Sequence, residues 1–168
     1  MMNTKRLFFY NLIVFFLPAT KFFTFKSKLL CWCGAKIGEN VRIVSSARFQ
    51  ISGLLEIGDN TWIGHEVLIV GGNSKVSIGN NCDIAPRVLI ATGSHKLNKI
   101  TDSKIAGKGY SKDIIIGNGC WICAGANILG GTTIGEKSIV AAGGVCRGTL
   151  KAGAVYGGVP IKLIKMLD

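Results

Sequence analysis

Aliphatic residues recur every six positions along most of this chain, and this period restricts the possible folds more than any other feature of the sequence. Thirteen of the fifteen six-residue units open with isoleucine, and glycine follows directly in six of them. The fifth position of a unit is Ala, Val, Ser, Thr or Cys in eleven of the fifteen. The first residues of the units are Ile37, Ile43, Ile51, Ile57, Ile63, Ile69, Ile78, Ile84, Ile90, Ile116, Ile122, Ile128, Ile134, Val140 and Cys146. Two positions of each unit are therefore restricted in size or polarity.

A period of six fits neither an α-helix, which repeats every 3.6 residues, nor a simple amphipathic strand, which repeats every two. It is typical of a solenoid of short parallel strands, in which each unit forms one flat side, its first residue points inward and its fifth must be small. Three units close one coil, so fifteen units predict about five coils whose stacked isoleucines form the core. We therefore expect an all-β fold, a parallel β-helix of hexapeptide repeats.

The repeat also divides the chain. Residues 34–150 carry the units, residues 1–33 form an apolar and basic N-terminal segment, and residues 151–168 form a C-terminal tail or extension. Because insertions in a solenoid must loop out of the stack, the two breaks in the rhythm are candidates for function. The first is a three-residue excess in Val70–Ser77, and the second is the long excursion from His95 to Asp113.

His95 stands where the second excursion leaves the stack, directly after Ser94, which we expect in the small inward position. The loop of residues 95–113 contains five lysines and two glycines, Gly107 and Gly109, which we expect to be flexible points. Two interpretations are open: a solvated charged loop, or a flap that covers a cleft and offers cations to an anionic ligand.

The net charge of +11 is unevenly distributed, because six basic residues precede Glu39, the first acidic residue. This favours an anionic partner, either nucleic acid, a phospholipid surface or a phosphate-bearing small molecule. Nucleic acid is disfavoured, since no recognisable reading motif accompanies the basic residues.

The apolar run of the N-terminal segment, Leu7 to Pro18, is shorter than the ~20 residues of a membrane-spanning helix. We expect a short helix that either packs against the end of the domain or lies in a membrane interface with its cations at headgroup level. In the second case the protein would associate with the inner face of the membrane. A cleaved secretory signal is disfavoured, because no clear small-x-small site precedes Lys21.

The six cysteines include a C-x-x-C at Cys120 and Cys123, a spacing that suits zinc or redox chemistry. However, Cys82 and Cys120 occupy the small fifth position and Cys146 an isoleucine position, where a thiol acts as a small hydrophobe. Cys123 falls in the turn and should point away from Cys120. The sequence thus predicts structural, reduced cysteines in a cytoplasmic protein, and no metal site.

The repeat and three further segments resemble the hexapeptide-repeat acetyltransferases, in particular their sugar O-acetyltransferase branch. The segments are ATGSH, IIIGNGCWICAGANILGGTTIGEKSIVAAGGV and YGGVPIKLIK, and the resemblance covers roughly residues 34 to 167. It implies a left-handed β-helix, acetyl-CoA as cosubstrate without a metal, and a homotrimer with active sites between subunits. It also implies an acceptor sugar in surface polysaccharide, that is capsule, exopolysaccharide or O-antigen.

The resemblance assigns the general base to His95. An asparagine of galactoside-type members falls on His65, which is a departure and leaves open whether this residue binds the acceptor, assists the base or caps a turn. An acidic residue is frequent nearby in the polysaccharide branch, so the resemblance implies that Glu66 could orient an imidazole. For the cosubstrate, the resemblance places an aromatic residue near the thioester, which falls on Trp121. Two backbone amides that contact the pantetheine arm fall on Ala124 and Ala142. The cations near the phosphates fall on Arg147, Lys162 and Lys165. The family's Thr-Lys pair is replaced by Arg147 and Gly148, so one cation is displaced by a position.

A neutral imidazole can remove the proton of a hydroxyl as its oxygen attacks a thioester, while backbone N–H groups stabilise the oxyanion. We therefore expect direct transfer in a ternary complex. Three alternatives are weighed: N-acetylation of a nucleotide-linked amino sugar or another small amine, a non-catalytic scaffold, and a metalloenzyme of the γ-carbonic-anhydrase kind. The last needs three histidine ligands, and the chain has two histidines.

Overall fold

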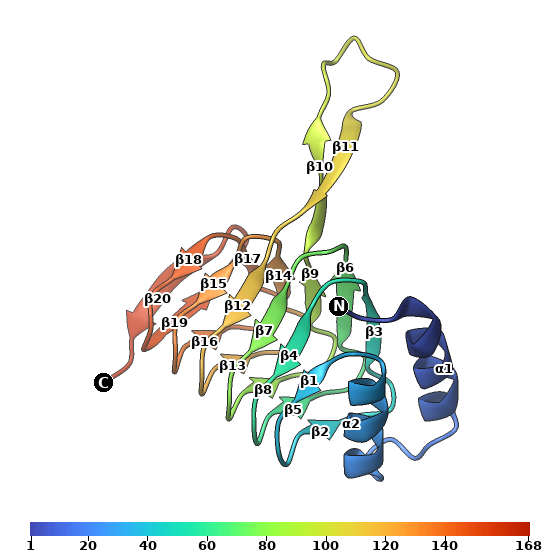
Figure 1. The fold of residues 1–168 in the computed structure, drawn as a ribbon. Coiled ribbons are helices and arrows are strands. Elements are labelled where there is room, and N and C mark those ends of the chain that lie inside the picture. Colours follow the sequence, from blue (N-terminus) through green and yellow to red (C-terminus); the bar gives the residue numbers. More distant parts are fainter.

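The computed structural model describes residues 1–168 and shows a three-sided parallel β-helix preceded by two helices (Figure 1). We call its three sheets faces A, B and C. Face A contains β1 (Lys36–Ile37), β4 (Leu55–Ile57), β7 (Val76–Ile78), β12 (Ile114–Ile116), β15 (Thr133–Ile134) and β18 (Thr149–Leu150). Face B contains β2 (Arg42–Ile43), β5 (Trp62–Ile63), β8 (Asp83–Ile84), β13 (Trp121–Ile122), β16 (Ile139–Val140), β19 (Ala154–Gly157) and β20 (Lys162–Met166). Face C contains β3 (Arg48–Ile51), β6 (Leu68–Gly71), β9 (Leu89–Ala91), β14 (Asn127–Leu129) and β17 (Val145–Cys146).

Five coils use all three faces, and a sixth coil has only β18 and β19. The predicted all-β solenoid is therefore confirmed, with an additional incomplete coil. Because β19 pairs in parallel with β16, part of the expected C-terminal tail belongs to the stack. Only β20 runs antiparallel, folding back along β19.

The isoleucine ladder forms the core as predicted. Parallel pairing places Ile43, Ile63, Ile84, Ile122 and Val140 in register along face B, and each of these side chains is fully buried. The inward side of each strand favours β-branched residues, because they pack closely on a pleated, half-buried surface. The ladder thus fixes the register of one coil on the next.

Three of the cysteines lie in the core. The thiols of Cys82 and Cys120 donate to the carbonyls of Gly117 and Gly135, both at 3.1 Å, and all six cysteines are free. Burial raises the pKa of the Cys146 thiol to about 12. No group of three or more His, Cys, Asp and Glu side chains is placed to bind a metal ion. The buried positions predicted for these three residues are confirmed.

One expected unit is wrong. The residue in register with Ile69 on face C is Phe49, and Ile51 pairs with Gly71. Phe49 therefore opens the third side of the first coil, and a two-residue insertion between Phe49 and Ile57 is a third break in the rhythm. An aromatic ring fits here because the first coil lies at the end of the stack, where Phe49 packs edge-on against Tyr10 at 5.7 Å between ring centroids.

The helices α1 (Thr4–Phe15) and α2 (Phe23–Trp32) lie against the first coil (Figure 1). The side chain of Asn3 caps α1 by accepting from the amide of Arg6 at 3.1 Å. One side of α1 buries Leu7, Tyr10 and Val14. The expected helix packed against the end of the domain is confirmed. Neither helix has the length and apolar content that crossing a membrane requires.

The second excursion forms a two-stranded antiparallel arm, β10 (Gly93–Leu97) and β11 (Ala106–Ser111), which projects from the stack (Figure 1). The chain leaves the coil after Thr92, which is fully buried and bonds to both Val70 and Lys112 through its backbone. Ser94 is exposed, so its expected inward position is wrong. The excursion carries its own backbone hydrogen bonds and is not an irregular loop.

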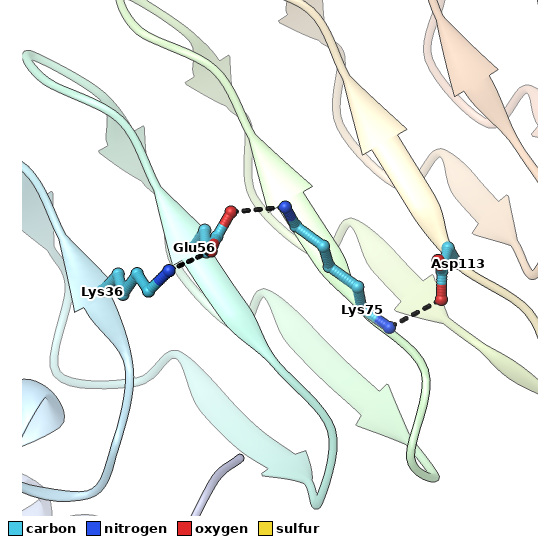
Figure 2. A network of polar contacts seen from close by, with 4 residues as sticks. All are labelled: Lys36, Glu56, Lys75 and Asp113. Atoms are coloured by element: carbon cyan, nitrogen blue, oxygen red, sulfur yellow. Dashed lines mark hydrogen bonds and ion pairs between the residues drawn. The ribbon is translucent and has the colours of Figure 1, made fainter.

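A row of charges on face A links neighbouring coils (Figure 2). The Glu56 carboxylate lies 2.9 Å from the Lys36 ammonium and 2.5 Å from the Lys75 ammonium. The hydrogen bonds from these lysines hold the pKa of Glu56 below its usual range. Asp113 accepts from the backbone amide of Lys75 at 2.8 Å, which anchors the returning end of the excursion.

Candidate active site

His95 lies on β10 near the base of the arm, with its side chain exposed. Its Nδ1 is 2.8 Å from the carbonyl oxygen of Gly107. A carbonyl oxygen only accepts, so this bond assigns the proton to Nδ1 and leaves Nε2 as an unprotonated acceptor. The imidazole is thus held in the tautomer that a general base needs.

A β-bulge brings that carbonyl to the ring. His95 pairs with Gly109, but Leu97 pairs with Ala106, so β11 holds one residue more than β10 over this interval. A Cβ atom on Gly107 would lie 2.1 Å from the Asn98 side-chain oxygen and 3.0 Å from the carbonyl of Lys96. Only glycine fits here without a shift of its neighbours.

Gly107 is a functional candidate, whereas the sequence predicted it only as a flexible point of the loop. The signal in the sequence is a pair of glycines, Gly107 and Gly109, within an otherwise charged excursion. Their spacing does not reveal which carbonyl turns toward His95, because that depends on the bulge.

The opposite side of the arm base is cationic. Tyr110 pairs with Ser94 across the arm, and the Arg147 guanidinium donates to the Tyr110 hydroxyl at 3.4 Å. The hydrogen bond with Ser94 and the charge of Arg147 lower the pKa of Tyr110 below its usual value. The Lys112 ammonium lies 6.0 Å from the centroid of the same ring. Arg147 has no carboxylate partner, so its charge is available to an anion.

His65 and Glu66 lie elsewhere, in the turn between β5 and β6. His65 Nδ1 is 3.5 Å from the Ser46 hydroxyl, and the Glu66 carboxylate accepts from Arg87 Nε at 2.7 Å. Glu66 has a left-handed backbone conformation, with φ of 56°. Its carboxylate is thus engaged by Arg87, and the partner of the His95 imidazole is Gly107. Within one chain, Glu66 orients neither imidazole.

The expected cosubstrate residues other than Arg147 gather on face B and the turns that follow it. Trp121 points outward from β13 with half of its surface exposed. Ala124 and Ala142 occupy equivalent exposed turns of successive coils, and Lys162 and Lys165 are exposed on β20. Ala124 borders a cavity of about 520 Å³ whose other lining residues are His65, Glu66, Pro86, Arg87 and Gly125.

The structure therefore divides the predicted site residues between two edges of the β-helix. His95, Tyr110 and Arg147 lie at the edge between faces C and A, while His65, Glu66, Ala124 and Ala142 lie at the edge between faces B and C. The strands of face C separate the two edges. A second cavity of about 310 Å³ lies at the arm base and is lined by Gly72, Asn73, Gly93, Gly109, Tyr110 and Ser111. Neither cavity contains residues of both edges.

Known proteins resemble this chain over most of its length. It is 36% identical over 111 residues to the putative acetyltransferase YJL218W of Saccharomyces cerevisiae, covering 66% of this chain and 55% of that protein. It is 31% identical over 134 residues to the galactoside O-acetyltransferase of Escherichia coli, covering 80% of this chain and 64% of that protein. It is 29% identical over 146 residues to the putative colanic acid biosynthesis acetyltransferase WcaF of Escherichia coli, covering 85% and 75%. The chain thus spans between about half and two thirds of the first two relatives. No family model matches it.

Among solved structures, the hexapeptide-repeat containing acetyltransferase VCA0836 of Vibrio cholerae, complexed with acetyl-CoA, has the same fold. The TM-score is 0.81 at 23% sequence identity, over 98% of this chain and 87% of that one. This likeness includes the N-terminal region as well as the coils, since it extends over nearly the whole chain.

Proposed function

We propose that this chain is a member of the hexapeptide-repeat acetyltransferases, in their sugar O-acetyltransferase branch, and that it transfers an acetyl group from acetyl-CoA to a sugar hydroxyl. The observation that carries the proposal is the fixed tautomer of His95, with Nδ1 bonded to the Gly107 carbonyl and Nε2 open to solvent. A relative named galactoside O-acetyltransferase supports a sugar hydroxyl as acceptor. Relatives named for colanic acid and lipopolysaccharide biosynthesis support an acceptor in surface polysaccharide.

In this mechanism His95 Nε2 accepts the proton of the acceptor hydroxyl while the oxygen attacks the carbonyl carbon of the thioester. Backbone N–H groups at the coil edge stabilise the oxyanion that forms. When the intermediate collapses, the C–S bond breaks and the imidazolium returns its proton to the departing thiolate. The products are the acetyl ester and free coenzyme A, so the base is regenerated without a covalent acetyl-enzyme.

The residues proposed for the cosubstrate suit its chemistry. Arg147, Lys162 and Lys165 form no ion pair within the chain, as the pyrophosphate and 3′-phosphate of coenzyme A require of their partners. Trp121 offers an exposed ring, and Ala124 and Ala142 place small side chains where a pantetheine arm would approach the backbone. Acetyl-CoA supplies the activated acyl group.

We further propose that the active unit is a homotrimer with each site between two subunits. The division of the candidate residues between two edges supports this, because packing one edge of a subunit against the other edge of its neighbour would unite them. Half-buried apolar residues on the outward side of face C would lie between the joined edges: Leu68, Val70, Leu89, Leu129 and Val145.

Mixing two inactive variants tests the shared site. His95→Ala removes the base at one edge, and Ala142→Trp blocks the other edge without entering the core. If sites form between subunits, equal co-expression should restore about a quarter of wild-type activity, since one site in four then receives both intact edges. If the mixture stays inactive, each site belongs to a single chain.

The primary experiment compares His95→Ala with His65→Ala in a thiol-release assay with acetyl-CoA and panels of hydroxyl and amino sugars. We expect His95→Ala to lose about 10²- to 10⁴-fold in kcat while acetyl-CoA binding persists. Undiminished transfer by His95→Ala contradicts the mechanism. Transfer to amino sugars alone would instead support the N-acetyltransferase alternative.

A further inference from the structure

The outer side of α1 is apolar and uncovered. Phe8, Phe9, Leu12, Phe15 and Phe16 expose between 49% and 76% of their surfaces, and we call this set the N-terminal apolar surface. Two of its ring pairs pack edge-on, Phe8 with Phe9 at 5.6 Å and Phe15 with Phe16 at 5.3 Å between centroids. Five large side chains gathered on one short helix form a contiguous patch, unlike the scattered apolar residues of an ordinary surface.

Helical geometry separates this surface from the packed side of α1. At 100° per residue, Phe8, Leu12 and Phe15 fall on one stripe, with Phe9 and Phe16 beside it. Leu7, Tyr10 and Val14, which pack on the first coil, fall on the opposite stripe. The helix is therefore apolar on both sides, and packing on the β-helix explains only one of them.

The segment that carries the apolar surface has cations and no anions in its sequence. Residues 1–38 contain six basic side chains and no acidic one. Arg6 is held by Trp32, whose carbonyl it contacts at 2.9 Å, and Lys26 is buried. Lys5, Lys21 and Lys28 are exposed and have no carboxylate partner.

We propose that the N-terminal apolar surface docks on a membrane containing anionic phospholipid. Its rings would enter the headgroup and acyl boundary, while Lys5, Lys21 and Lys28 contact lipid phosphates. With 12 residues, α1 is about 18 Å long, so it would lie along the bilayer, whose hydrocarbon core is ~30 Å thick.

The charge pattern selects lipid over a second copy of this chain. Self-association through the same surface would bring together two segments that each carry unpaired cations and no anion, which is unfavourable. An anionic bilayer supplies the missing negative charge together with an apolar phase.

The placement of α1 leaves the rest of the molecule free. It lies at the first coil, whereas the arm leaves the stack between the third and fourth coils, and β20 lies at the far end (Figure 1). Docking through α1 would thus leave uncovered the arm with His95 and the edge residues that follow it in the chain, Ala124, Ala142 and Arg147.

Vesicle co-sedimentation of the full chain tests the proposal, with phosphatidylglycerol–phosphatidylcholine vesicles compared with phosphatidylcholine alone. We expect binding to the anionic vesicles that weakens as salt increases. The triple variant Phe8→Ser, Phe15→Ser, Phe16→Ser should lose binding, and the same positions changed to Leu should retain it. A matched control is Leu97→Ser with Ile100→Ser on the arm, because these side chains are 83% and 91% exposed and lie far from α1 in the chain.

A second variant isolates the charges: Lys5→Gln, Lys21→Gln and Lys28→Gln together should lower the partition coefficient on the order of 100-fold. The proposal is overturned if the wild-type chain does not bind anionic vesicles, or if the serine triple variant binds as well as wild type. It is also overturned if the serine variant changes the oligomeric state in sedimentation, because the occupant is then a second copy.

Discussion

Replacing Gly107 by alanine should impair catalysis without touching the imidazole of His95. The added Cβ would lie 2.1 Å from the Asn98 side-chain oxygen and 3.0 Å from the Lys96 carbonyl. Asn98 would have to swing away and give up its 3.1 Å bond to the carbonyl of Lys104, and the bulge would shift by tenths of an ångström. The Gly107 carbonyl, which fixes the His95 tautomer, moves with it.

The size of the effect follows from what the carbonyl does. A hydrogen bond of this kind contributes about 1 kcal/mol, and a misplaced catalytic group costs up to ~100-fold in rate. We therefore expect Gly107→Ala to lower kcat about 10- to 100-fold, with little change in the KM for acetyl-CoA. The assay is steady-state thiol release, with the Nδ1 proton of His95 followed by NMR.

The matched control is Gly93→Ala at the base of the same arm, where a Cβ atom meets nothing within 4 Å. It should leave kcat within about twofold of wild type, since surface changes of this kind are usually small in free energy. Equal activity of the two variants would refute the orienting role of Gly107. Equal loss in both would show that the arm as a whole, and not this carbonyl, is sensitive.

Three further predictions concern stability. Ile84→Ala, at a fully buried ladder position, should reduce the free energy of unfolding by about 2–5 kcal/mol in urea denaturation. Ile115→Ala, at a side chain that is 45% exposed, should reduce it by less than about 1 kcal/mol. Similar losses of unfolding free energy in the two variants would contradict the assignment of Ile84 to the core. Burial lowers the pKa of Lys26 from 10.5 to about 8. Between these pH values the unfolded chain binds more protons than the folded chain, so the free energy of unfolding rises with pH. The stability of wild type relative to Lys26→Met should therefore rise over this range, by at most about 3 kcal/mol. A difference that is constant from pH 7.5 to 10 would argue against that shift. Glu56→Gln should change the unfolding free energy by about 1 kcal/mol or less, because its ion pairs with two lysines are partly exposed to solvent, and the difference should shrink further in 1 M salt.

The hexad period predicted the ladder because the coil itself imposes it: each side needs one inward residue per turn. The same rule misplaced Ile51, since the insertion that follows Phe49 leaves Ile51 six residues before Ile57 and so imitates a regular unit. The inward residue of this unit is the aromatic Phe49, which packs on Tyr10, and a search for aliphatic residues does not find it.

Single residues of the candidate site could be proposed from the sequence, but their arrangement could not. His95 could be singled out because it stands where the repeat stops, and this position can be found from the neighbouring residues in the sequence alone. No residue spacing predicts the antiparallel arm, the bulge at Gly107 or the division of the site between two edges. These features depend on contacts between residues that the six-residue period does not relate to one another. The helix α2 was likewise not expected as a separate element, because its buried residues, Lys26 and Leu30, include a lysine.

A stack of identical coils has no inherent length, and the ends of this one determine where it stops. At the first coil, α1 and α2 cover the open end. At the other end, β20 lies along β19, and the segment of residues 158–161 bonds to both backbone groups of Val145 on the edge of face C. Growth by adding a coil from another molecule is thereby blocked at both ends, since free strand edges invite such pairing. The number of coils is therefore fixed by the segments that cover the two ends. At the first coil, α1 covers the end of the stack with one side and exposes its other side to the surroundings.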